Sequence, residues 1–135
     1  GGDGGQRRGG RGGIAAQRER ALARQVERIV EQRLLNPLIT YVHATRSPTG
    51  RPSNEHVAQW ACAEWPAALL YLDNLLADGR EFLMGDHVSV ADCTLAATLQ
   101  FARFNKTDLL HGLDALTHWD GQYRERAVAR MVLSL

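Results

Sequence analysis

The residues best equipped for chemistry in this sequence are five histidines, two cysteines and one aspartate in an apolar stretch. No two histidines have the HxxxH or HExxH spacing that places two imidazoles on one side of a helix, so the sequence predicts no metal site. A thiol is a good nucleophile only where it is exposed and its pKa is lowered. Cys62 and Cys93 lie in apolar stretches and are predicted to be reduced, buried core residues. The histidines are His43, His56, His87, His111 and His118.

Asp92 lies in the stretch FLMGDHVSVADCTLAA, whose other residues mostly suit burial. It could act as a general base, but its position three residues after Ser89 in the sequence indicates another role. A serine at the N-cap and an acidic residue three positions later form a capping box, in which each side chain accepts the other's backbone N–H. The carboxylate also lies at the positive end of the helix dipole. The sequence therefore predicts a structural capping box and no catalytic residue.

A run of charged residues lies in the N-terminal third of the chain. Arg20, Arg24, Glu27 and Arg28 could contact a ligand from a helix. Alternatively they form a solvated face, in which Arg24 pairs with Glu27 and Arg28 pairs with Glu31, each three residues further on. The residues alone leave both interpretations open.

Aromatic side chains give a second set of binding candidates. Tyr41, with Val42 beside it, and Phe101 and Phe104 could line an apolar substrate pocket. The alternative is that they pack in the core, where aromatic side chains bury much of their surface.

Helices are predicted to position all of these residues. Apolar residues recur at helical spacing from Ile14 to Leu34. Asn36 is predicted to kink or end this helix, because a residue that precedes a proline avoids the α region. Residues 38–44 are predicted to add one or two further helical turns.

Three more helices follow in the prediction. One covers about residues 54–78, with Ser53 or Asn54 as its N-cap, a kink at Pro66 and Gly79 after its end. Another covers about residues 89–104, is apolar almost all round, and is predicted to be the buried core helix. The last has an apolar stripe that consists of Leu113, Leu116, Trp119, Tyr123 and Ala127. No stretch has a clear β-strand pattern, so the predicted fold is an all-α bundle of four to five helices.

Length and composition indicate one soluble globular domain of 135 residues. No apolar run approaches the roughly 20 residues of a membrane-spanning helix, so no membrane association is expected. Residues 1–13, GGDGGQRRGGRGG, contain eight glycines and no apolar residue. They are predicted to be a disordered tail ahead of a domain over residues 14–135. The tail resembles arginine–glycine segments of RNA-binding proteins, but it has no aromatic residue to stack on bases, so nucleic-acid binding is not expected.

The capping box belongs to a longer pattern that resembles a known family. A glycine–aspartate pair, a short loop and this box introduce the core helix in the C-terminal domain of glutathione S-transferases, and the bacterial members are the most similar. The stretch ERALARQVERIVEQRLLNPL resembles the first helix of that domain, and LTHWDGQYRERAVARM resembles its closing segment, although Ala127 replaces a common proline. The resemblance covers about residues 14–132. The matching pattern residues are Gly85, Asp86, Ser89, Ala91 and Asp92.

The resemblance implies a role within a larger enzyme. Glutathione transferases activate glutathione mainly in an N-terminal thioredoxin-like domain, and no βαβ pattern precedes Ile14. In a complete enzyme, glutathione would be the co-substrate and would be conjugated to a hydrophobic electrophile. The resemblance also implies that the first helix, with Arg20, Arg24, Glu27 and Arg28, faces the cleft between the domains. The chain alone is expected to bind no cofactor and to be inactive, so its status as an enzyme stays open.

The alternative is a non-catalytic protein–protein interaction module, a role that stand-alone domains of this family have in translation-factor and aminoacyl-tRNA synthetase assemblies. The expected partners are a second copy of the chain through the first two helices, a thioredoxin-like domain, or another protein. The expected location is the cytoplasm.

Overall fold

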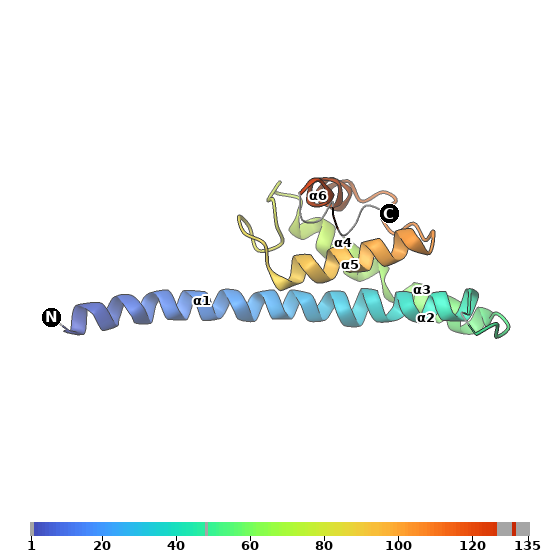
Figure 1. The fold of residues 1–135 in the computed structure, drawn as a ribbon, viewed down its shortest axis with the longest axis horizontal. Coiled ribbons are helices and arrows are strands. Elements are labelled where there is room, and N and C mark those ends of the chain that lie inside the picture. Colours follow the sequence, from blue (N-terminus) through green and yellow to red (C-terminus); the bar gives the residue numbers. More distant parts are fainter. Residues whose placement is uncertain (1, 48, 127–130, 132–135) are drawn as a thin grey trace.

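The fold is described from a computed structural model that covers residues 2–47, 49–126 and 131, with side chains from residue 13 onward. The regular secondary structure of this part of the chain is helical, and an isolated bridge between Phe82 and Gly85 is the strand-like contact within it. Four helical segments follow one another along the described chain (Figure 1). The predicted all-α bundle of four to five helices is therefore confirmed.

The first segment is one continuous helix with a local change of hydrogen-bond register. Helix α1 (Gly2–Val30) passes into a π-helix (Glu31–Leu35) and then into α2 (Asn36–Thr45). Asn36 has φ −62° and ψ −45°, so the prediction that it avoids the α region is wrong. Its N–H bonds to the carbonyl of Glu31, five residues earlier, and this π register lets the helix continue past Pro37, which has no N–H to donate. The prediction of a helix over residues 38–44 is confirmed.

Helix α1 begins earlier than the sequence predicts. The composition predicts a disordered tail over residues 1–13, whereas α1 extends back to Gly2. Figure 1 shows this end of α1 projecting beyond the other helices. A helix that is already formed gains one hydrogen bond for each residue it adds, while each glycine costs about 1 kcal/mol relative to alanine. The structure and the composition therefore differ over residues 2–13, and Gly1 lies outside the described residues.

The second segment is broken in two at Trp65, into α3 (Glu55–Glu64) and α4 (Pro66–Leu75). Asn54, one of the two predicted caps, is the cap of α3, because its side-chain oxygen accepts the N–H of Val57 at 3.1 Å. Pro66 begins α4, at a position where a missing N–H leaves no helical hydrogen bond unmade. The predicted kink is thus a boundary between two helices.

The third and fourth segments are α5 (Val90–Phe104) and α6 (Asp114–Glu125). Asp73 of α4 accepts the N–H of Leu116 in the first turn of α6 at 2.9 Å, so one helix supplies the cap of another. Leu116 and Trp119, from the predicted apolar stripe, are buried. Ala127, the last residue of that stripe, lies outside the described residues.

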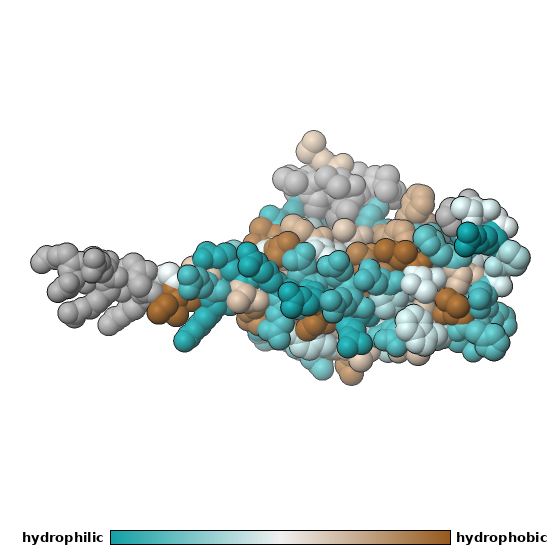
Figure 2. All heavy atoms as spheres, turned by 90° about the horizontal axis from the view of Figure 1, so that it is seen from below, coloured by the Kyte–Doolittle hydropathy of each residue, from teal (hydrophilic) through white to brown (hydrophobic). Residues whose placement is uncertain are grey.

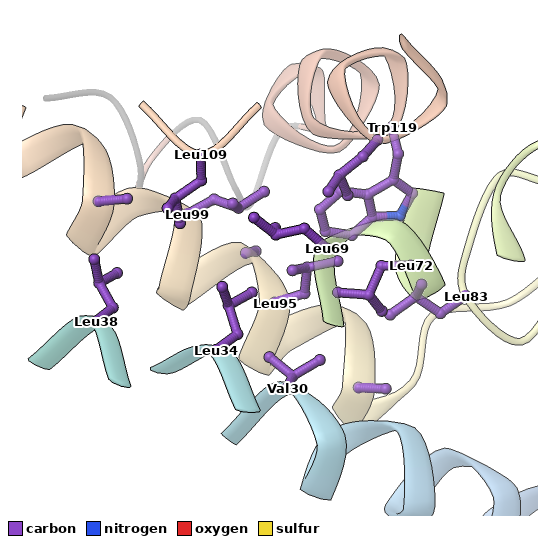
Figure 3. Close-up of a cluster of buried hydrophobic side chains, with 14 of the residues drawn as sticks. Val30, Leu34, Leu38, Leu69, Leu72, Leu83, Leu95, Leu99, Leu109 and Trp119 are labelled. Carbon is purple, nitrogen blue, oxygen red and sulfur yellow. The ribbon is translucent and has the colours of Figure 1, made fainter. Parts of the chain in front are cut away.

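The core lies where α5 packs against the first segment on one side and against α4 and α6 on the other (Figure 3). Leu95 and Leu99 of α5 are in the middle of this cluster. The residues around them in Figure 3 are Val30, Leu34, Leu38, Leu69, Leu72, Leu83, Leu109 and Trp119. The predicted role of α5 as the core helix is confirmed for this side.

The opposite side of α5 is exposed, although its residues are apolar. Val90 is 46% exposed and Phe104 is 74% exposed, and Cys93 and Ala97 lie between them on the same helical face. The prediction that α5 is buried almost all round is therefore wrong for this face, because the described elements leave it largely exposed. We call Val90, Cys93, Ala97 and Phe104 the outer face of α5.

The surface along α1 is mainly hydrophilic. Figure 2 views the molecule from the α1 side, where polar residues dominate and apolar residues are scattered. Among the described residues, no helix is both long enough and apolar enough to cross a membrane.

Candidate functional site

A cavity of about 510 Å³ lies between the second half of α1 and the loop that leads into α5. Helix α1 contributes charged side chains and two alanines to it, and the loop contributes mainly apolar side chains. We call this cavity the α1 cleft. Its lining residues are Ala16, Glu19, Arg20, Ala23, Arg24, Glu27, Met84, His87, Val88, Ser89 and Val90.

Helical spacing explains the charged wall of the α1 cleft. Arg20, Arg24 and Glu27 follow one another at four and three residues, so their side chains project from the same side of α1. Ala23 lies between them and is buried, and its small side chain lets the loop approach the helix backbone. The Thr94 hydroxyl of α5 donates to Oε1 of Glu27 at 3.3 Å, a contact that joins α1 to α5 beside the cleft.

The opposite wall is a loop held in place by Asp92. The carboxylate of Asp92 is fully buried and accepts the N–H of Ser89 at 2.9 Å, the Ser89 hydroxyl at 3.0 Å and the N–H of Leu83 at 2.8 Å. Ser89 and Asp92 thus have the pairing of a capping box. Since Asp92 is buried and all its contacts are within the fold, it cannot reach a substrate. It acts on the cleft only by fixing the position of the loop.

The same loop needs a residue with unusual backbone angles. Phe82 and Gly85 exchange two backbone hydrogen bonds, at 3.0 and 2.9 Å, and so close a tight turn. Gly85 has φ +117°, a conformation that side chains rarely allow. This requirement explains the glycine in the Gly85-Asp86 pair.

His87 connects the loop to α1 at the rim of the α1 cleft. Its Nε2 lies 2.5 Å from Oε1 of Glu19, and its Nδ1 lies 3.0 Å from Oδ1 of Asp86. The hydrogen bond to Asp86 and the nearby charge of Glu19 raise the pKa of His87 above its usual 6.5. The same hydrogen bond lowers the pKa of the Asp86 carboxyl. Only the protonated ring can donate to both carboxylates, so the charged form favours this connection.

The sequence predicts seven substrate-binding candidates, and the structure places only some of them in the α1 cleft. Arg20, Arg24 and Glu27 line the α1 cleft, and Arg28 does not, although it is on the same helix. No described residue forms an ion pair with Arg24 or Arg28, so the structure shows neither of the two alternative pairs with Glu27 and Glu31. The described ion pairs involve Arg33, Arg80, His87 and Arg103.

The aromatic candidates lie away from this cleft. Tyr41 of α2 packs edge-to-face against Trp65, with 5.4 Å between the ring centroids, at the margin of the core. Phe101 is partly buried and Phe104 is exposed, both near the C-terminal end of α5. None of the three lines the α1 cleft.

The two cysteines are more accessible than the sequence predicts. Cys93 is exposed on the outer face of α5 and Cys62 is partly buried, so the prediction of buried thiols is wrong. For Cys93 the error follows from the prediction that α5 is covered on all sides. Tyr123 donates a hydrogen bond to Sγ of Cys93 at 3.8 Å, and burial, together with this contact, raises the pKa of Tyr123 to about 12. Its phenol therefore stays neutral near pH 7.

Metal chemistry has no support within the described part of the chain. No group of three or more histidine, cysteine, aspartate or glutamate side chains is arranged there to hold a metal ion.

Sequence reasoning missed the loop side of the α1 cleft. Met84, His87 and Val88 line it, yet they are far from α1 along the chain. The stretch GDHVS directly before the capping box was the available signal, since a loop fixed to a helix N-terminus has a defined position. Its contact with Glu19 depends on the packing of α1 on α5, which no local pattern encodes.

Comparison with known proteins agrees with this all-helical fold. Residues 15–119 match the family model described as "Glutathione S-transferase, C-terminal domain". A glutathione S-transferase domain-containing protein of Marinobacter aquaeolei VT8 has a similar structure, with a TM-score of 0.70 and 28% identity over 84% of this chain. Gtt2 from Saccharomyces cerevisiae (TM-score 0.72, 24% identity, 82% of this chain) and a glutathione transferase of Methylococcus capsulatus str. Bath (0.71, 21%, 86%) share the fold. No curated protein sequence matches the chain.

The matched length sets the scope of the similarity. The alignments cover 57%, 54% and 53% of those three chains, so this chain spans just over half of the length of its structural relatives. The family model, by contrast, matches well over half of this chain, from the first half of α1 to Trp119 in α6. The chain belongs to the family of glutathione S-transferase C-terminal domains.

Proposed function

We propose that this chain is the C-terminal half of a glutathione-conjugating transferase and that the α1 cleft holds the part of the substrate that is not glutathione. The observation that supports this most directly is the cleft itself. It combines charged side chains on α1 with the apolar Met84, Val88 and Val90 on the facing loop. A pocket of this kind suits an apolar electrophile with a polar end.

The exposed apolar outer face of α5 favours a second domain of the enzyme that packs against this one. Val90 lines the α1 cleft and also begins that exposed apolar face. Large exposed apolar surface often marks an interaction site. A thioredoxin-like domain, which would activate the glutathione thiol, is the partner in this proposal. The 135-residue chain alone should then be inactive in conjugation.

The test is binding of a product-like ligand to the chain alone. S-hexylglutathione is titrated into labelled protein and backbone amide shifts are recorded, with S-methylglutathione as the matched control that lacks the apolar tail. We expect weak binding, with a Kd on the order of 1 mM. The shifts should cluster over residues 16–27 and 84–90 and should require the hexyl group. Shifts elsewhere, or equal shifts with both ligands, would contradict the proposal.

A non-catalytic interaction module is the second candidate, and exposed apolar residues on the second segment favour it. Trp60 is 60% exposed, Leu70 is 54% exposed and Tyr71 is 40% exposed on α3 and α4. A second copy of the chain, bound through the first segment and the α3–α4 segment, would cover part of this surface. Light scattering should then show a dimer that Trp60→Glu converts to monomer, while a monomer at high micromolar concentration would contradict it. The free thiols fit a reducing compartment, so a cytoplasmic location is part of both proposals.

A further inference from the structure

A second cavity lies at the opposite end of α5 from the α1 cleft. It has a volume of about 320 Å³ and is formed by the last turns of α5 and the segment that leads toward α6. We call it the α5-end cavity. It shares no lining residue with the α1 cleft, and its volume suits a small ligand. A ligand bound there would therefore be separate from the substrate of the proposed function.

The floor of the α5-end cavity is apolar. Leu99 and Ala102 are each 2% exposed and Leu109 is 6% exposed, so the floor is continuous with the core. Leu110 is partly buried beside them. Figure 3 shows Leu99 and Leu109 at this end of the core. An aliphatic or aromatic group that covered this floor would be removed from water, which favours binding.

The mouth of the α5-end cavity has one positive and one negative side chain. Lys106 and Asp108 both line it, and within the described part of the chain neither of them belongs to an ion pair. Arg103 also lines the cavity, but its guanidinium is neutralised by the buried Asp120 at 2.9 Å. An ammonium and a carboxylate are therefore available to a ligand beside the apolar floor.

Hydrogen bonds fix the backbone around this mouth. The N–H of Thr107 bonds to the carbonyl of Ala102 at 2.9 Å and closes the end of α5. Oδ1 of Asp108 accepts the N–H of Leu110 at 3.0 Å. Oδ2 of Asp108 accepts no hydrogen bond from any residue that the structure describes, so it can accept one from a ligand. Because the cavity is already formed, binding requires little ordering of the backbone.

We infer that the α5-end cavity binds an apolar L-α-amino acid such as leucine. The side chain of the ligand contacts the leucines of the floor, its carboxylate pairs with Lys106, and its ammonium pairs with Asp108. A free amino acid fits better than the C-terminus of a peptide, because the carboxylate of Asp108 bonds more strongly to an ammonium than to an uncharged amide. Contacts at three different points also distinguish the L from the D enantiomer.

The test titrates four ligands with the same aliphatic side chain into the isotope-labelled 135-residue chain and records backbone amide shifts. L-leucine has both charges, N-acetyl-L-leucine has only the carboxylate, and L-leucinamide has only the ammonium. D-leucine has both charges in the mirror-image arrangement.

Two variants remove the charges of the mouth one at a time. They are Lys106→Gln and Asp108→Asn, and the asparagine keeps an oxygen that can accept the N–H of Leu110. Arg124→Gln and Asp114→Asn are the matched controls, because each removes one charge from an exposed position that does not line the cavity.

L-leucine should bind with a Kd on the order of 1 mM, and its shifts should cluster over residues 99–110. The other three ligands should each bind about tenfold more weakly, since each loses a charge-assisted contact or its alignment. Lys106→Gln should weaken L-leucine and N-acetyl-L-leucine but not L-leucinamide. Asp108→Asn should weaken L-leucine and L-leucinamide but not N-acetyl-L-leucine, and the control variants should behave as the wild type.

Four outcomes would overturn the inference. They are an absence of L-leucine shifts over residues 99–110, equal binding of the two enantiomers, equal binding of L-leucine and a singly charged ligand, and an equal loss in the control variants. Circular dichroism melts, together with retained binding of the unaffected ligand, show that each variant is folded. The S-hexylglutathione experiment uses another ligand and monitors other residues, so its failure and the failure of this one are separate results.

Discussion

The buried carboxylate of Asp92 accepts the backbone N–H of Leu83, nine residues earlier, at 2.8 Å. Its other oxygen accepts the N–H and the hydroxyl of Ser89. One side chain therefore caps α5 and also fixes the loop that forms a wall of the α1 cleft. A capping box alone would explain only the second set of contacts.

Asp92→Ala should consequently cost more than the loss of a cap. A cap contributes about 0.5–2 kcal/mol, and each buried donor left without a partner costs about 1–3 kcal/mol. Because Leu83 and Ser89 both lose their acceptor, we expect Asp92→Ala to lower the free energy of unfolding by about 3 kcal/mol or more. Ser89→Ala should cost about 1 kcal/mol, since Asp92 keeps its bond to Leu83.

Denaturant melts of the wild type, both single variants and the double variant measure these values. The double variant should lose less than the sum of the single variants, because the two side chains act as one unit. A loss below about 0.5 kcal/mol for Asp92→Ala, as for a surface substitution, would contradict this role.

Local patterns were sufficient to predict much of this fold. The Ser89–Asp92 spacing predicted the start of α5, and a cap at Ser53 or Asn54 predicted the start of α3. The common cause is that caps, helical periodicity and proline effects act over a few residues, within reach of a sequence pattern. The π-helix before Pro37 was missed because a proline can be accommodated by a register shift as well as by a helix end.

Only the α1 wall of the candidate site could be predicted from the sequence. Arg20, Arg24 and Glu27 share a helix, so their common face followed from spacing alone. His87 and Val88 lie opposite them through tertiary packing that a single sequence does not encode. The exposure of Cys93 has the same origin, since an apolar face of a helix does not show whether another element covers it.

Deletion of residues 1–13 should leave the thermal midpoint within about 2 °C of the full chain. This part of the chain projects beyond the other helices in Figure 1, and glycine-rich backbone has few side chains to bury. Scanning calorimetry of the two proteins gives the comparison. Amide exchange should also be fast before Ile14, and slow exchange there, or a larger drop in midpoint, would show that this stretch packs on the domain.

Lys106→Gly should stabilise the domain by about 1 kcal/mol, because it removes a strained residue at the end of α5. Lys106 has φ +55°, and the N–H of Thr107 bonds back to the carbonyl of Ala102 at 2.9 Å, as in a helix end that favours glycine. Lys106→Ala is the matched control, since it removes the charge and keeps the backbone strain. Equal stabilisation by both substitutions, measured in urea melts, would assign the effect to the charge.

The last prediction concerns the titration of His87. Its hydrogen bond to Asp86 of the loop and the nearby charge of Glu19 of α1 raise its pKa above 6.5, and Asp92 of α5 adds a smaller effect in the same direction. Because the folded pKa is raised, the stabilising contribution is fully present below about pH 6.5 and is lost as the pH rises through the folded value. Glu19→Gln and Asp86→Asn should each lower the midpoint of the His87 imidazole proton resonance, while the other four histidine resonances should keep theirs.

The protonation state of His87 should also control how strongly the α1 cleft binds anions. Loss of the proton leaves Glu19 as an unpaired carboxylate beside Arg20, so binding of the anionic probe 1-anilinonaphthalene-8-sulfonate in the cleft should weaken as the pH rises through the folded pKa of His87. The neutral probe N-phenyl-1-naphthylamine should show no such change, and His87→Gln should remove most of the pH dependence. If Glu19→Gln leaves the His87 midpoint where it is in the wild type, the connection between α1 and the loop is absent in solution.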